Sequence, residues 1–80
     1  MARNENIKAI IDVQGERLKE IRKHYGVTTV RFSKEIGLER SALWRCETGK
    51  MVIPTQALYG IWERYKVSPG MVLGIEKLRF

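Results

Sequence analysis

The feature that most constrains the fold is a helical apolar period that ends at a glycine several times along the chain. From residue 13 onward, apolar side chains recur at offsets of three and four, and strand alternation appears nowhere convincingly. Glycine ends helices readily because it adopts the left-handed backbone conformation at low cost. The glycines at these ends are Gly26, Gly37, Gly49 and Gly74. The sequence therefore predicts an all-α protein of short helices.

Capping residues divide residues 15–74 into five predicted helices. The first is expected over about Gly15–Tyr25. Thr28 is a good N-cap for the second helix, which Gly37 ends. The third is expected over Glu39–Thr48, so that only a tight glycine turn separates it from the second. This pair of short helices is the central element of the predicted fold.

Proline marks the start of the last two helices. Pro54 stands where a helix tolerates proline, and Ser68 with Pro69 forms an N-cap followed by proline at the first helical position. The chain is thus expected to comprise an N-terminal extension over residues 1–14, one five-helix domain, and a C-terminal tail over residues 75–80.

Composition excludes several classes of protein. Eighty residues carry 15 Lys and Arg against 9 Asp and Glu, a net charge of +6, and a chain this short builds a single core. Cys46 is the single cysteine and His24 the single histidine, so neither a disulfide scaffold nor a Cys/His metal site is expected. The sequence contains no nucleophile–base set, carboxylate pair or phosphate-binding glycine loop, so we expect neither an enzyme nor a cofactor.

The sequence also contains no candidate membrane segment. Its longest apolar runs are three residues, whereas a membrane-spanning helix needs about 20. The N-terminal residues lack the hydrophobic segment of a signal peptide, so the expected location is the cytoplasm.

A series of short motifs runs in register over residues 15–73. They are Gly15, Ile21-Arg22, Gly26-Val27-Thr28, Phe32-Ser33, Ile36-Gly37-Leu38, Glu39-Arg40-Ser41 and Glu47-Thr48-Gly49-Lys50. Together they resemble the helix-turn-helix family of phage repressors, Cro proteins and related bacterial regulators. The resemblance covers about three quarters of the chain. It implies a compact, five-helix, lambda-repressor-like DNA-binding domain.

The resemblance also implies roles for individual residues. The positions that match base-reading positions of the family are Thr29, Arg40, Ser41 and Arg45. The positions where the family tends to contact phosphate are Thr28, Thr48 and Lys50. A buried ion pair between Arg22 and Glu47 is implied to clamp the first helix to the end of the third. Such a pair is structural, because a buried charge is tolerated only when it is paired and hydrogen-bonded.

The residues themselves support a role in binding DNA. An α-helix fits the ~12 Å major groove, and the second helix of a helix-turn-helix pair enters it. On the third predicted helix, the polar and aromatic residues lie opposite Leu43 and Cys46; they are Arg40, Ser41, Trp44, Arg45 and Thr48. Arginine reads guanine with two hydrogen bonds, and an exposed Trp44 could contact thymine methyl groups.

Two residues depart from the pattern of the family. The family commonly has glutamine where Thr29 stands, so base recognition is expected to differ there. Glu39 replaces the usual Ser or Thr cap. Its charge suits a helix N-terminus but would repel a nearby phosphate.

We therefore predict a sequence-specific, double-stranded DNA-binding transcriptional regulator, a repressor that inserts its helix over residues 39–48 into the major groove. The alternative is a protein-interaction module on the same scaffold, such as an antitoxin or an anti-repressor partner. In that case Trp44, Met51, Val52 and Ile53 would grip a protein.

Apolar clusters at the two ends predict a homodimer. One cluster comprises Ile7, Ile10 and Ile11, and the other comprises Ile75, Leu78 and Phe80. Both could fold back on their own domain. We expect instead that at least one packs against a second copy, since a two-fold dimer places two recognition helices ~34 Å apart, one turn of DNA. The C-terminal cluster is the predicted dimer contact.

Overall fold

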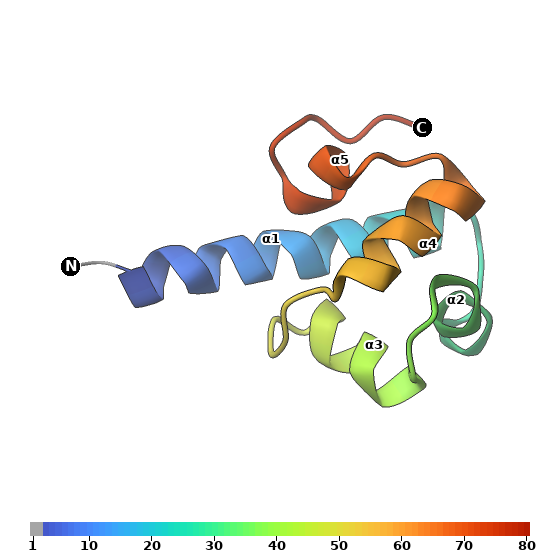
Figure 1. Cartoon of the computed structure of the whole chain (residues 1–80), viewed down its shortest axis with the longest axis horizontal. Coiled ribbons are helices and arrows are strands. Elements are labelled where there is room, and N and C mark those ends of the chain that lie inside the picture. Colours follow the sequence, from blue (N-terminus) through green and yellow to red (C-terminus); the bar gives the residue numbers. More distant parts are fainter. Residues whose placement is uncertain (1–2) are drawn as a thin grey trace.

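The structure of the protein, a computed structural model, describes the chain from residue 3 to residue 80, with side chains from residue 7 onward. These residues form five helices and no strand: α1 (Arg3–His24), α2 (Thr29–Ile36), α3 (Arg40–Glu47), α4 (Thr55–Tyr65) and α5 (Pro69–Leu73). Helix α1 packs against α3 and α5, while α4 packs against α2 and α5 (Figure 1). The predicted all-α, five-helix fold is confirmed.

Local capping interactions define the short helices. The Thr28 side chain accepts a hydrogen bond from the Arg31 N–H at 3.1 Å, and Gly37 ends α2 with φ 75°. Ser68 accepts from the Met71 N–H at 3.2 Å at the start of α5. Helix α3 spans the predicted segment without its two end residues, which serve as its caps. The expected starts and ends of these helices are therefore confirmed.

The predicted start of the first helix is wrong. Helix α1 runs without a break across the boundary expected between residues 14 and 15, and its first turns project beyond the other helices (Figure 1). Gly15 lies inside α1, at the point where α1 and the end of α3 approach each other closely. A Cβ atom at position 15 would lie 2.6 Å from the Cys46 carbonyl oxygen. This glycine thus serves close packing rather than helix initiation.

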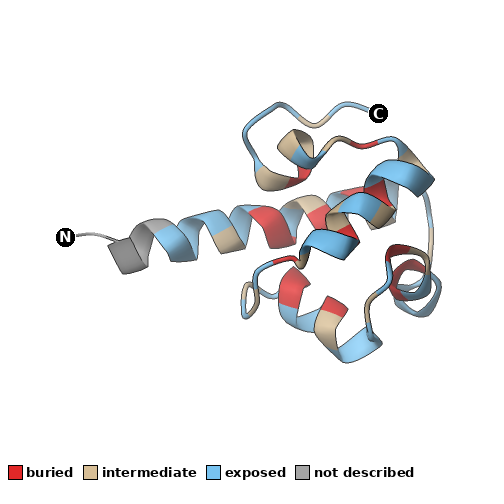
Figure 2. Ribbon diagram, in the orientation of Figure 1, coloured by how far each residue is buried: buried red, intermediate tan, exposed pale blue. Residues whose placement is uncertain are grey.

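The hydrophobic core lies where α1 through α5 converge (Figure 2). Its buried residues are Leu18, Ile21, Phe32, Ile36, Leu43, Cys46, Ile53, Ala57, Ile61, Val67 and Val72. The burial of Ile53 corrects the expectation that this residue grips a protein partner. Its backbone N–H donates to Gln14 Oε1 at 3.4 Å, so the loop before α4 is anchored to α1 at this point.

The C-terminal tail contacts its own domain. Leu78 packs against the core, and the Phe80 ring stacks on His24 with centroids 3.7 Å apart. Ile75, by contrast, is 79% exposed. Of the three residues predicted to form a dimer contact, two therefore have partners within the same chain.

The single cysteine of the chain has a structural role. Cys46 is buried, and burial raises the pKa of its thiol, so it packs as a small apolar side chain. Among the side chains that the structure describes, those of residues 7–80, no three metal-binding groups cluster together. No helix within residues 3–80 is both long and apolar enough to cross a membrane.

A polar network joins α2 to α4. Glu35 accepts hydrogen bonds from the Tyr65 hydroxyl and from Arg31 Nε at 3.0 Å, and Arg64 Nε lies 3.8 Å away. The hydrogen bond from Tyr65 and the two guanidinium groups outweigh burial and lower the pKa of Glu35. Burial, together with the neighbouring carboxylate, raises the pKa of Tyr65 to about 12.

The raised pKa of Tyr65 predicts a loss of stability at alkaline pH. The unfolded chain loses the Tyr65 proton near pH 10, whereas the folded chain keeps it to about pH 12. The contribution of Tyr65 to stability is thus present below pH 10 and is lost between pH 10 and 12. The difference in Tm between the parent and Tyr65→Phe is expected to shrink over that interval. A difference that stays constant from pH 9 to 12 would contradict this assignment.

Candidate nucleic-acid interface

A short turn joins α2 to α3 and keeps the two helices in contact. Gly37 adopts the left-handed conformation, and the Leu38 N–H donates to the Ser33 carbonyl at 2.8 Å. Behind the turn, Phe32 and Leu43 are buried in the core. Because these contacts occupy one side of α3, the opposite side faces solvent.

The exposed side of α3 carries the residues predicted to read bases. Arg40, Ser41, Trp44 and Arg45 are all exposed. Trp44 has 58% of its surface accessible, although tryptophan on a helix commonly packs in a core. The helical period therefore separates the buried and exposed sides of α3 as the sequence predicted.

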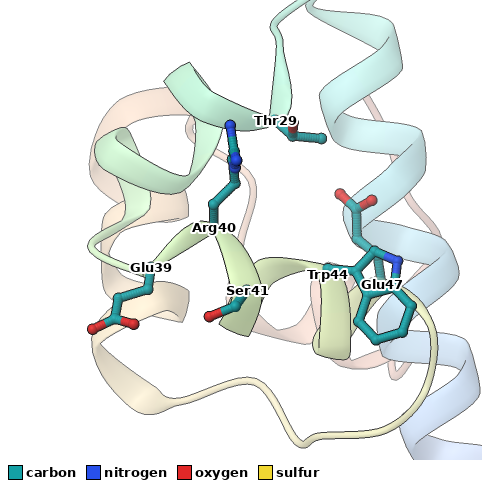
Figure 3. Close-up of a pocket in the computed structure, with 6 residues that line it drawn as sticks. All are labelled: Thr29, Glu39, Arg40, Ser41, Trp44 and Glu47. Carbon is teal, nitrogen blue, oxygen red and sulfur yellow. The ribbon is translucent and has the colours of Figure 1, made fainter.

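A groove beside α3 brings residues of two helices together (Figure 3). It has a volume of about 560 Å³, and its lining residues are Thr29, Glu39, Arg40, Ser41, Trp44 and Glu47. Arg40 extends toward α2, whereas Glu39 and Ser41 point away from it (Figure 3). Four of the five predicted base-reading residues thus line one groove. Arg45, the fifth, is exposed on α3 but is not part of the lining.

Glu47, which lines this groove, forms an ion pair with Arg22 of α1. Arg22 Nε donates to Glu47 Oε2 at 2.9 Å, and Arg22 Nη2 donates to Glu47 Oε1 at 3.1 Å. The two side chains are only 19% and 9% exposed. A planar guanidinium with two parallel bonds restrains the carboxylate in both position and orientation. The structure therefore pairs the two residues that were expected to join α1 to the end of α3.

Comparisons with known proteins agree with this geometry. A family described as "Helix-turn-helix domain" matches residues 15–74. The chain belongs to this family. The helix-turn-helix domain is also 28% identical over 64 residues to Antitoxin PezA of Streptococcus pneumoniae serotype 4 (strain ATCC BAA-334 / TIGR4). That alignment covers 80% of this chain and 40% of the relative, so the chain spans less than half of the relative's length. No solved structure matches the chain significantly.

Three residues of the helix-turn-helix domain were predicted to contact phosphate, and the structure gives each a different environment. The Thr28 hydroxyl oxygen accepts from Arg31, which leaves its proton to be donated. The Thr48 hydroxyl donates to the Trp44 carbonyl at 2.8 Å, so its proton is used at the end of α3. Lys50 Nζ lies 5.8 Å from the centroid of the Trp44 ring, beside the exposed side of α3. Thr28 and Lys50 are thus the better placed donors.

Sequence reasoning missed the part that two residues of α1 play in positioning α3, although Gly15 belongs to the series of motifs. Gln14 and Gly15 lie on the side of α1 that packs against the end of α3 and the following loop. Their signal was helical spacing, because Gly15 precedes Leu18 by three positions and Arg22 by seven. In the helix-turn-helix domain, these contacts and the ion pair hold α3 at its C-terminal end.

Proposed function

We propose that this helix-turn-helix domain is a sequence-specific, double-stranded DNA-binding transcriptional regulator, a repressor, that inserts α3 into the major groove. The observation that carries the proposal is the groove beside α3, where Arg40, Ser41 and Trp44 on the exposed side of α3 lie together with Thr29 of α2. The net charge of +6 favours association with a polyanion.

Each residue of this surface has a role in the proposal. Arg40 and Arg45 donate hydrogen bonds to the major-groove edges of guanines. The hydroxyl groups of Thr29 and Ser41 form hydrogen bonds with the edges of other bases. Trp44 packs on thymine methyl groups. Phosphate contacts come from the three residues Thr28, Thr48 and Lys50, and Thr48 contributes least because its hydroxyl proton is already donated.

Two alanine substitutions test the proposal by separating base contacts from phosphate contacts. Arg45→Ala is expected to cost about 1–3 kcal/mol on the preferred site and to relax preference at one base position. Lys50→Ala is expected to weaken all sequences alike and to reduce the slope of log K against log salt by about one unit. Titrations of selected and random duplexes at several salt concentrations measure both effects. Equal losses on both duplexes for Arg45→Ala would remove it from the base-reading set.

We further propose a homodimer on a two-fold DNA site. The predicted contact comprised Ile75, Leu78 and Phe80, of which Ile75 keeps the most exposed surface. Ile7 and Ile10 are each 51% exposed on the projecting part of α1 and provide a second apolar surface. Both surfaces have an energetic reason to associate, since burying one such side chain yields roughly 1.5–3 kcal/mol.

Substitution of one isoleucine at a time tests the dimer. The full chain is expected to be dimeric at tens of micromolar by analytical ultracentrifugation, and Ile75→Asp is expected to make it monomeric. Ile10→Asp serves as the comparison. If Ile10→Asp alone gives a monomer, the contact lies on α1 instead of the tail. A monomeric full-length protein would contradict the dimer.

A protein partner is the second candidate function. The relative that matches this chain is named an antitoxin, and Trp44 and Val52 leave large apolar surfaces exposed near α3. Met51 is half-buried and packs against the core, while Ile53 is inside it, so a protein partner would meet Trp44 and Val52 first. Retention on heparin that disappears as salt rises would favour DNA, because counterion release produces that dependence. Retention that is absent at low salt would favour the protein partner.

A further inference from the structure

Glu39 is an acidic residue on a surface that is proposed to face DNA. It is the N-cap of α3, with φ −71° and ψ 152°, and its side chain makes no capping hydrogen bond. The side chain is exposed and lines the groove together with Arg40 and Ser41. Figure 3 shows its carboxylate pointing away from Thr29 and Trp44, to the same side as the Ser41 hydroxyl.

The fold does not use this carboxylate. Glu35 is held by Tyr65 and Arg31, and Glu47 is held by Arg22. Among the described side chains, residues 7–80, no ion pair within 4.0 Å engages Glu39. Because the Glu39 carboxylate makes no capping hydrogen bond and joins no two elements, it can accept hydrogen bonds from a bound molecule.

A carboxylate tolerates very few partners in the major groove. Ionised Glu is an acceptor only, so it is repelled by phosphate and by the acceptor atoms of guanine and thymine. Cytosine presents only its N4 amino donor there, flanked on one side by the O6 acceptor of the paired guanine. The N6 amino group of adenine lies between two acceptors, its own N7 and the O4 of the paired thymine. The base that Glu39 accommodates best is therefore cytosine.

We propose that Glu39 is a specificity-determining residue that selects cytosine at one position of the bound DNA by accepting a hydrogen bond from N4. It acts by excluding guanine and thymine as much as by attracting cytosine. The inference rests on the proposed DNA-binding function. It also accounts for the departure from a Ser or Thr cap, since a hydroxyl bonds to donors and acceptors alike.

Selection of bound sequences from a random duplex pool tests the inference. The parent is expected to show cytosine at one position, next to the position that Arg40 determines. Glu39→Gln is expected to lose that preference and to admit adenine, which an amide reads with two hydrogen bonds. The ratio of affinities for cytosine over guanine at that position should fall roughly 5- to 150-fold, equivalent to about 1–3 kcal/mol at ~1.36 kcal/mol per factor of ten.

Two further variants sharpen the test. Glu20→Gln, at an exposed position of α1, makes the same change in charge outside α3 and should leave the selected sequence unchanged. Glu39→Ala should lose the cytosine preference without gaining adenine. If Glu39→Gln raises affinity for all duplexes equally and alters no base position, Glu39 only repels phosphate and the inference is overturned. If the parent enriches no sequence at all, the proposed function fails, and this inference fails with it.

Discussion

Arg22→Met is expected to lower the free energy of unfolding by about 3–5 kcal/mol, because it leaves the Glu47 carboxylate without its partner in a largely buried place. The pair makes two hydrogen bonds, at 2.9 and 3.1 Å, between α1 and the last residue of α3. Glu47→Gln is expected to be destabilising as well, since the guanidinium loses its counter-charge. Urea titrations of both variants measure the effect.

A second ion pair on α1 provides the matched control. Lys19 Nζ lies 3.2 Å from Glu16 Oε1, but the two side chains are 34% and 66% exposed. Exposed pairs contribute about 0–1 kcal/mol, so Lys19→Met is expected to have little effect. Replacing both Arg22 and Glu47 with apolar residues should recover part of the loss, as no unpaired charge remains. Equal effects of Arg22→Met and Lys19→Met would show that the α1–α3 pair is not a buried one.

Gly15→Ala is expected to destabilise the fold by about 1–3 kcal/mol, the usual cost of overpacking. The direction is opposite to helix propensity, which favours alanine over glycine by about 1 kcal/mol inside a helix. The new Cβ would lie 2.6 Å from the Cys46 carbonyl oxygen and 2.9 Å from that of Glu47. Both contacts are with backbone, so α1 and α3 must move apart.

Gly70→Ala is the control for this substitution. Gly70 lies inside α5, and a Cβ there would meet the exposed, flexible side chain of Glu76. That side chain can move aside, so we expect a change between neutral and a gain of about 1 kcal/mol. Thermal and urea denaturation of both variants gives the comparison. A Gly15→Ala variant as stable as Gly70→Ala would show that the α1–α3 contact has room for a methyl group.

The candidate site illustrates how far helical spacing alone can lead. Helical spacing predicted that Leu43 and Cys46 face the core while Arg40, Ser41 and Trp44 face solvent. The reason is that side chains three or four positions apart lie on the same side of a helix. Helical spacing could not show that the Thr48 hydroxyl donates its hydrogen bond to the Trp44 carbonyl, or that Lys50 lies beside the Trp44 ring. Those contacts depend on the conformation of the chain at and after the end of α3.

What the sequence determined by itself was local. The ends of α2 and α5 follow from Thr28, Gly37, Ser68 and Gly74, whose capping bonds and left-handed turns involve only residues three or four positions away. The burial of Ile53 and the attachment of the tail through Phe80 were decided by tertiary structure. Gly15 illustrates the reason: its role depends on the backbone of Cys46 and Glu47, which only the folded chain brings beside α1.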